Sequence, residues 1–81
     1  MRIHLKLFAT FREVVGETDI VMEVEADSTV EDVVTELLGT YPKLKGHRDS
    51  MIYSVNKEYA DPGETLSDGD EVGILPPVTG G

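Results

Sequence analysis

Hydrophobic and polar residues alternate at the start of the chain. Residues 2–7 place apolar side chains at every second position, which is the period of a half-buried strand. Residues 19–25 repeat the pattern, with Ile20, Met22 and Val24 on one side. The link over residues 8–16 loses the alternation, and Gly16 favours an end to one or two short helical turns there. Because this link is short, we expect the two strands to pair antiparallel.

A helical pattern follows over about three turns. Its apolar side chains recur at the spacing of one helix face, namely Val30, Val33, Val34, Leu37, Leu38 and Tyr41. Ser28 and Glu31 match the capping box that starts a helix. Gly39 is the predicted C-terminal stop, and Pro42 prevents continuation. The single apolar stripe predicts that this helix covers one face of a sheet.

The second half of the chain predicts three further strands. Residues 43–50 are expected to form a polar loop, residues 51–55 a strand, and residues 56–59 a reversal into a short strand ending near Ala60. Residues 71–75 form the last expected strand, and the two prolines that follow end the sheet. This order predicts an α+β fold, a small mixed sheet covered on one face by one main helix. We expect one domain over residues 1–75 and an extended tail over residues 76–81.

Composition narrows the classes of partner. The chain has 81 residues, with 16 acidic against 7 basic side chains and a formal charge of −9. Nine acids and no Lys or Arg lie between Glu13 and Glu36, a surface that nucleic acid would avoid. There is no cysteine for a disulfide or a thiolate site. No run of residues is apolar enough for a membrane span or a signal peptide, so we expect a cytoplasmic protein without a membrane partner.

Ordinary enzyme sites are not evident. His4 and His47 show no spacing that would unite them on a metal, and we interpret both as surface residues. The acids near the C-terminus lack the spacing of a calcium loop, so no metal site is predicted. Glycine-rich phosphate-binding loops are also missing, which leaves any ATP to a partner protein.

The C-terminal segment carries the chemistry instead. Pro76 and Pro77 stiffen the exit from the last strand, and Gly80 and Gly81 lack the Cβ that would stop them entering a narrow channel. Extended at about 3.3 Å per residue, the tail reaches roughly 20 Å from the domain. Its reactive group is the α-carboxylate of Gly81, which needs activation by a partner. These residues therefore predict that the tail is an arm that a partner enzyme uses as its substrate.

Four blocks of sequence carry a family resemblance. The chain resembles the small subunits of molybdopterin synthase, the MoaD-type sulfur carriers of the ubiquitin-like β-grasp family. The blocks occur in the family's order and are Leu7–Phe8–Ala9 with Phe11–Arg12–Glu13 and Gly16, then Val55–Asn56–Lys57–Glu58–Tyr59, then Leu66–Ser67–Asp68–Gly69–Asp70–Glu71–Val72, and Leu75–Pro76–Pro77–Val78–Thr79–Gly80–Gly81. The resemblance spans nearly the whole chain and implies that the first and last strands lie parallel at the centre of the sheet.

The resemblance also implies a chemistry and a set of partners. An E1-like adenylyltransferase would use ATP and magnesium to adenylate the Gly81 carboxylate, and a sulfur donor protein would convert it to a thiocarboxylate. The large molybdopterin synthase subunit would accept the loaded tail, in a heterotetramer, and pass the sulfur to a pterin. The carrier would bind no cofactor and supply no catalytic side chain.

Each tail residue has an expected role under this resemblance. Gly81 is the reacting residue and Gly80 provides clearance, while the other tail residues, Pro76, Pro77, Val78 and Thr79, position it in the partner. We expect Phe8 and Leu75 to contact the partner as apolar residues at strand ends. Ordinary burial in the core is the open alternative for both.

Three alternative functions stay open at this point. A ubiquitin-like modifier would join Gly81 to substrate lysines through the same activated carboxylate. A sulfur carrier for thiazole synthesis would share the fold and the Gly–Gly end. A β-grasp interaction module would have an inert tail.

Overall fold

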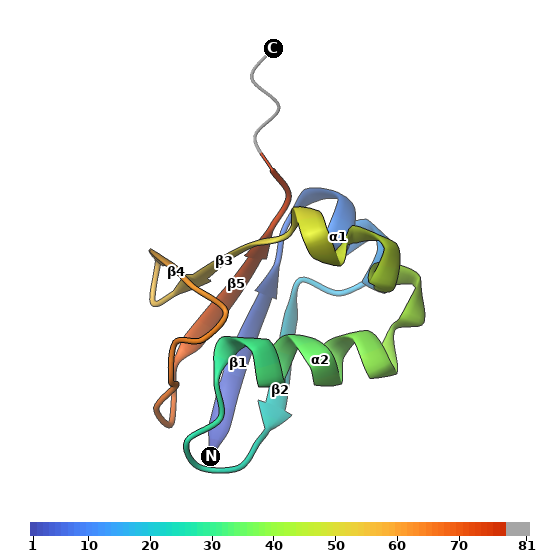
Figure 1. Cartoon of the computed structure of the whole chain (residues 1–81). Helices are drawn as coiled ribbons and strands as arrows, with labels where there is room; N and C mark the ends of the chain where they lie inside the picture. The colour runs from blue at the N-terminus through green and yellow to red at the C-terminus, as the bar shows by residue number, and fades with distance from the viewer. Residues whose placement is uncertain (78–81) are drawn as a thin grey trace.

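The computed structural model describes residues 1–77 and contains a five-stranded sheet with α2 (Val30–Thr40) packed across one face (Figure 1). The strand order is β2-β1-β5-β3-β4. The strands are β1 (Arg2–Leu7), β2 (Asp19–Glu23), β3 (Ile52–Val55), β4 (Glu58–Ala60) and β5 (Glu71–Leu75). Two further helical segments, α1 (Ala9–Val15) and η1 (Pro42–Ser50), complete the fold. The expected α+β class and the sheet covered on one face are confirmed.

The two central strands come from opposite ends of the chain. β1 pairs parallel with β5, and β2 pairs antiparallel with β1. β3 pairs antiparallel with both β5 and β4. The antiparallel first pair and the parallel centre that the resemblance implied are both confirmed.

The core lies between the sheet and α2. Alternation along β1 buries Ile3, Leu5 and Leu7 completely and leaves the intervening side chains on the open face of the sheet. The α2 stripe meets them from the other side. Other core side chains are Phe11, Val30, Val33, Val34, Leu37, Leu38, Leu44, Met51, Tyr53, Val55, Leu66, Val72 and Ile74. No polar or charged residue is buried among residues 1–77.

The link between β1 and β2 is helical, as its lost alternation indicated. α1 begins after Phe8 and ends at Gly16, whose φ of 87° is the left-handed conformation that glycine adopts without strain. The Gly16 amide donates to the Arg12 carbonyl at 2.8 Å. The predicted stop at Gly16 is confirmed.

The capping box of α2 lies one residue later than predicted. Thr29 is the N-cap: its Oγ1 accepts from the Asp32 amide at 3.2 Å, and Asp32 Oδ2 accepts from the Thr29 amide at 2.9 Å. Ser28 instead donates its hydroxyl to the Glu25 carbonyl at 2.7 Å and closes the preceding turn. The prediction from Ser28 and Glu31 was therefore wrong, because the two overlapping patterns both fit the rule and the turn takes Ser28.

The segment before β5 satisfies the remaining first-turn amides of α2. The Val30 amide donates to the Glu64 carbonyl at 3.0 Å, and the Glu31 amide donates to the Pro62 carbonyl at 2.8 Å. The Val33 amide returns to the Thr29 carbonyl at 3.2 Å. With the Thr29 side chain, all the otherwise unpaired donors of this helix start have partners. Residues 61–66 are thereby fastened to α2.

The far end of α2 differs from the prediction in two ways. Gly39 lies inside the helix, which continues to Thr40 and is stopped by Pro42, so Gly39 is not the stop. The expected polar loop over residues 43–50 is the 3₁₀ segment η1, whose Leu44 is buried. Arg48 holds η1 against α2 by donating to Thr35 Oγ1 at 3.1 Å. The burial of Leu44 and the hydrogen bond from Arg48 to Thr35 therefore give an ordered structure to a segment that the sequence predicts as a loop.

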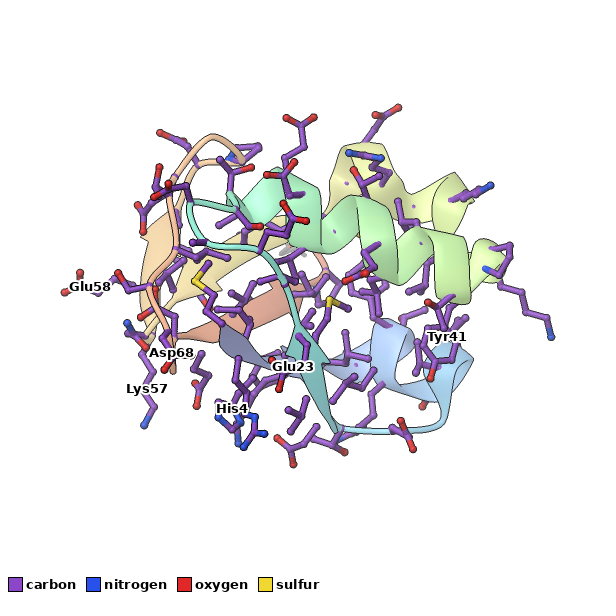
Figure 2. The ribbon with its side chains drawn as sticks, turned by 90° about the horizontal axis from the view of Figure 1, so that it is seen from below. His4, Glu23, Tyr41, Lys57, Glu58 and Asp68 are labelled. Carbon is purple, nitrogen blue, oxygen red and sulfur yellow. The ribbon has the colours of Figure 1, made fainter. Side chains whose placement is uncertain are left out.

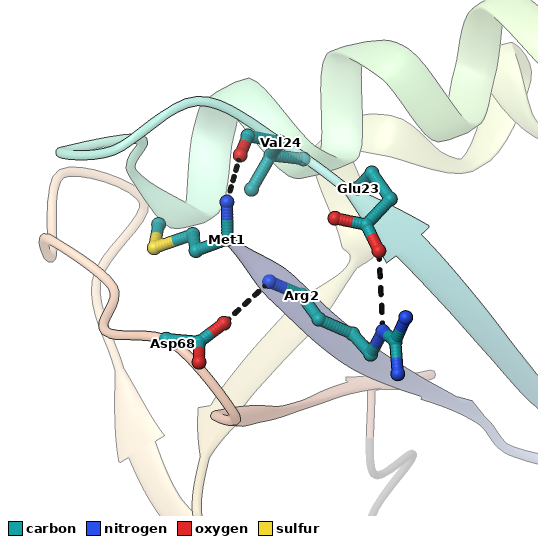
Figure 3. A network of polar contacts seen from close by, with 5 residues as sticks. All are labelled: Met1, Arg2, Glu23, Val24 and Asp68. Carbon is teal, nitrogen blue, oxygen red and sulfur yellow. Dashed lines mark hydrogen bonds and ion pairs between the residues drawn. The ribbon is translucent and has the colours of Figure 1, made fainter.

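Polar contacts fasten the N-terminus to two distant segments (Figure 3). The Met1 ammonium donates to the Val24 carbonyl at 2.6 Å, and the Arg2 amide donates to Asp68 Oδ1 at 2.6 Å. Arg2 Nε also pairs with Glu23 Oε1 at 3.1 Å. These contacts fix the start of β1 between the end of β2 and the turn before β5.

Candidate functional site

The exit path of the tail is set by the end of β5. The strand ends at Leu75, and Pro76 and Pro77 continue the chain away from the sheet (Figure 1). Pro76 is half-buried and Pro77 is exposed. The predicted tail residues Val78, Thr79, Gly80 and Gly81 lie outside the described residues, and their roles stay predictions.

Phe8 lies directly beside this exit. The parallel β1–β5 pair brings Leu7 level with Ile74, and the Phe8 amide donates to the Ile74 carbonyl at 3.3 Å. The Phe8 side chain is 41% exposed and Leu75 is half-buried, so neither belongs to the core. The structure therefore brings Phe8, Leu75 and the two prolines together at one end of the open face, and the core alternative does not hold for Phe8.

One row of residues crosses the open face through every strand. In register order it is Asp19, Lys6, Gly73, Ser54 and Tyr59. Gly73 and Ser54 are small and stand between the longer side chains of Lys6 and Tyr59. A depression on this face follows directly from that order of side-chain sizes.

The depression is an open groove of about 580 Å³. It lies at the base of the tail, since Phe8 and Leu75 form one end of it. Its lining consists of Lys6, Phe8, Ser54, Lys57, Tyr59, Glu71 and Leu75. Tyr59 is 81% exposed and Phe8 is 41% exposed, so the groove presents aromatic surface to solvent.

Gly73 determines how deep this groove is. A Cβ at position 73 would collide with Ser54 Oγ and would lie 3.4 Å from Phe8 Cε2 and 3.5 Å from Leu75 Cδ1. The Phe8 and Leu75 distances are ordinary contacts, so it is the Ser54 hydroxyl that lies close to the β5 backbone because residue 73 has no side chain. Glycine here serves close approach and not a special φ.

Lysines bring positive charge to the groove of an otherwise acidic protein. Lys6 Nζ lies 3.0 Å from Asp19 Oδ1, and this hydrogen bond, with the nearby Asp19 and Glu71 charges, raises the pKa of Lys6 above its ordinary 10.5. Lys6 is therefore held in its charged form. Lys57 adds a second ammonium group on the opposite side of the groove.

A tight turn holds Lys57 and Tyr59 in place. Asn56 and Lys57 have φ values of 51° and 72°, the left-handed pair that joins two antiparallel strands closely. The Asn56 side chain accepts from the Glu71 amide at 3.1 Å and donates to Asp70 Oδ1 at 3.0 Å. The β3–β4 hairpin is thus fastened to the start of β5, and the predicted reversal at residues 56–59 is confirmed.

The histidines lie in different parts of the molecule. His4 points from β1 on the side of the sheet turned away from α2 (Figure 2). His47 belongs to η1 and packs edge-on against Phe11, with ring centroids 5.7 Å apart. No group of acidic or histidine side chains within residues 1–77 is arranged to hold a metal ion. Within the same residues, no helix combines the length and hydropathy that a membrane span requires.

Sequence reasoning identified Phe8 and Leu75 but missed the rest of the groove. Lys6 and Gly73 are 67 positions apart in sequence, and these two residues meet Ser54 and Tyr59 only through strand register. The local signal for Tyr59 was its place on a short strand after a tight turn, opposite Ser54. The signal for Gly73 was a glycine inside an apolar strand, which often marks close backbone approach.

Comparisons with known proteins agree with this geometry. The profile of the ThiS family matches residues 5–81. A molybdopterin synthase sulfur carrier subunit of Chlamydomonas reinhardtii is 35% identical over 83 residues, with 100% of both chains covered. Small archaeal modifier protein 3 of Haloferax volcanii is 38% identical over 92 residues, again with 100% of both chains covered.

A solved structure has the same fold as this chain. The crystal structure of a small archaeal modifier protein from Haloferax volcanii superposes with a TM-score of 0.90 at 34% identity, and 100% of each chain is covered. The match includes the central parallel strands and the helix that crosses them. Because profile, full-length relatives and structure coincide, the chain belongs to the ThiS family, the ubiquitin-like β-grasp family that includes the MoaD-type sulfur carriers.

Proposed function

We propose that this protein carries sulfur on its C-terminal carboxylate for the assembly of molybdopterin. Gly81 is the residue loaded, and the groove on the open face docks the proteins that load and unload it. The observation that supports this proposal most is the position of the groove: Phe8 and Leu75 belong both to the groove and to the base of the tail. A partner that covers the groove therefore receives the tail at a fixed starting point.

The proposed loading has two steps. A Gly81 carboxylate oxygen attacks the α-phosphate of ATP on an E1-like enzyme, with magnesium, and pyrophosphate leaves. In the second step the terminal sulfur of a donor protein's persulfide attacks the acyl carbon and AMP leaves, which gives an acyl disulfide. A thiol then attacks the donor's cysteine sulfur, and the thiocarboxylate is released as that cysteine and the thiol form a disulfide. These reactions belong to the partners' active sites. The chain contributes position, because a tail held in reach converts an encounter between two molecules into a local reaction.

The proposed acceptor is the large subunit of molybdopterin synthase, paired with this chain in a heterotetramer. Phe8, Leu75 and Tyr59 supply an apolar and aromatic centre of the kind that dominates interface energy. Lys6 and Lys57 supply polar contacts at its rim. Gly80 and Gly81 then enter a channel too narrow for side chains.

Intact mass of the protein isolated from its own cells tests this proposal. Sulfur carriage gives a fraction heavier by the mass difference between sulfur and oxygen, mapped to Gly81 in the C-terminal peptide. A variant without Gly81 must lack that fraction while keeping the same thermal midpoint, because the described core is formed by residues 3–74. If the variant still restores molybdopterin synthesis in a strain lacking the carrier, the proposal is wrong.

Protein conjugation is the second candidate, and the similarity to small archaeal modifier proteins favours it. The same activated carboxylate would form an isopeptide bond with a lysine amine, and AMP or a thiol would leave. Peptides of cellular proteins with a branched Gly–Gly on lysine, traced to this chain, would establish it. A heavier fraction without any branched peptides would support sulfur carriage and not conjugation. Rescue of a thiazole-requiring strain in place of a molybdopterin-deficient one would reassign the sulfur to the third pathway.

A further inference from the structure

The outer edge of β2 has no strand beside it within residues 1–77. β2 is the first strand in the sheet order and pairs only with β1. An edge of this kind presents backbone donors and acceptors to whatever lies next to it. β2 is also longer than β4, the strand at the opposite edge.

Hydrogen bonds at both ends of the pair show which backbone groups point outward. The Met1 ammonium donates to the Val24 carbonyl at 2.6 Å, and the Val24 amide donates to the Met1 carbonyl at 2.9 Å. At the other end, the Leu7 amide donates to the Thr18 carbonyl at 2.9 Å. Hydrogen-bonded and non-hydrogen-bonded pairs alternate along antiparallel strands. The backbone groups of Asp19, Val21 and Glu23 therefore face away from β1.

A groove with apolar and acidic lining residues runs along this edge. It has a volume of about 280 Å³ and lies between β2 and the C-terminal half of α2. Ile20, Met22 and Tyr41 are half-buried in its wall, and Val21 on the other face of the strand is 57% exposed. Figure 2 shows Tyr41 at the end of α2 and Glu23 on β2. An added strand would find apolar contacts on both of its faces.

Charge selects among the strands that would fit. Glu23 and Glu36 line the groove, and the chain has no Lys or Arg from Glu13 to Glu36. A second copy of β2 would bring Asp19 and Glu23 against the same acids, which disfavours self-pairing. A strand flanked by Lys or Arg side chains meets the opposite charge.

We propose that the β2 edge and its groove bind an extended segment of a partner protein, apolar at alternate positions and flanked by lysine or arginine. The segment adds a sixth strand by pairing with the outward backbone groups of Asp19, Val21 and Glu23, and its apolar side chains cover Ile20, Met22 and Tyr41. This groove lies on the α2 side, and the groove near Phe8 lies on the open face. Both sites can be occupied together, so a partner is retained while the tail is engaged elsewhere.

Amide and methyl NMR of the full chain tests the proposal with a defined probe. The probe is a short peptide in which valines alternate with threonines between paired lysines. Matched probes replace the lysines by glutamates or N-methylate the central amides, which removes the donors of a ladder. We expect saturable shifts centred on Val21, Ile20 and Met22 with the basic probe, and loss of those shifts with either matched probe.

Substitutions separate strand pairing from plain charge attraction. Glu36→Lys should weaken binding of the basic probe about fivefold, whereas Glu58→Lys, an equal charge change on β4, should leave it unchanged. Val21→Pro removes an outward amide that β1 does not use, and Val21→Thr is its control. A chain lacking Gly81 should bind the probe normally, so failure of the tail proposal does not affect this result.

Three outcomes would overturn the inference. Equal loss in Glu36→Lys and Glu58→Lys would show attraction to net charge alone. Undiminished binding of the N-methylated probe would exclude a backbone ladder. Concentration-dependent dimerisation with the same shifts in the absence of peptide would assign the edge to a second copy of the chain.

Discussion

Gly73 shows how a missing side chain determines a surface at the residue scale. Glycine weakens a strand interior relative to alanine by about 0.5–1 kcal/mol, yet here it leaves room for the Ser54 hydroxyl beside the β5 backbone. The groove and the local instability have the same cause. Position 73 therefore has glycine, although alanine would suit a strand interior better.

A double-mutant cycle at positions 73 and 54 tests this reading. Gly73→Ala alone should bring no gain in the free energy of unfolding, because its Cβ meets Ser54 Oγ. With Ser54→Ala in the background, the same change should stabilise, with a coupling of about 1 kcal/mol between the two sites. Urea unfolding measures all four proteins. Additive effects would show that Ser54 turns aside without cost.

Tyr53 predicts how stability depends on alkaline pH. Burial raises the pKa of the Tyr53 hydroxyl above its ordinary 10.0. The unfolded chain then loses this proton at a lower pH than the folded chain, so the contribution of Tyr53 is complete below pH 10.0 and is lost as pH rises toward the folded value. Lys6, whose pKa is also raised, acts in the same direction above pH 10.5.

The measurement is the free energy of unfolding between pH 9 and pH 11, about one unit on each side of the tyrosine range. Tyr53→Phe should lose less stability over this interval than the unmodified chain. Tyr59→Phe is the control, because its ring is 81% exposed. Parallel curves for all three proteins would contradict the assignment to Tyr53.

At the scale of elements, the two ends of α2 test the corrected boundaries. Thr29→Ala removes the acceptor of the Asp32 amide and should cost about 0.5–2 kcal/mol. Ser28→Ala removes an exposed hydroxyl bond outside the helix and should cost less. Thermal or urea unfolding ranks the pair. A larger loss at Ser28 would return the cap to its sequence-predicted position.

Gly39 offers a stabilising change in the same helix. It lies inside α2, and a Cβ there has nothing within 4 Å. Gly39→Ala should therefore raise the free energy of unfolding by about 0.5–1 kcal/mol, through lower backbone entropy in the unfolded chain. Gly16→Ala is the contrasting control, since its φ of 87° strains any side chain. Gly16→Ala should destabilise.

Sequence patterns predicted the elements better than their junctions, for identifiable reasons. Alternation predicted β1 and β2 because, on each strand, the side chains of one face are less exposed than those of the other. The cap was misplaced because Ser28 and Thr29 both have an acid three residues later, and only the turn at Glu25 separates them. η1 depends on the burial of Leu44 and on Arg48 reaching Thr35, contacts with no local signature. The groove depends on register between distant strands.

At the scale of the whole molecule, net charge governs encounter. A formal charge of −9 repels nucleic acid and attracts basic protein surfaces over about 10 Å at 0.1 M salt. Association with the proposed activating enzyme or the proposed large subunit should slow as sodium chloride rises, with the dissociation rate changing less. Stopped-flow fluorescence measures both rates. An association rate indifferent to ionic strength would contradict this prediction.

The pairing of β1 with β5 also has a consequence for how the molecule comes into being. β1 pairs with β2 on one side, but its neighbour on the other side is residues 71–75, so during synthesis this second pairing forms only after those residues have left the ribosome. Contacts this distant in sequence slow folding relative to helical proteins. They also mean that only a chain that includes β5 can complete the sheet, since a chain that stops before β5 leaves a gap in the middle of its sheet. Every chain with a complete sheet therefore already contains the strand that precedes the tail.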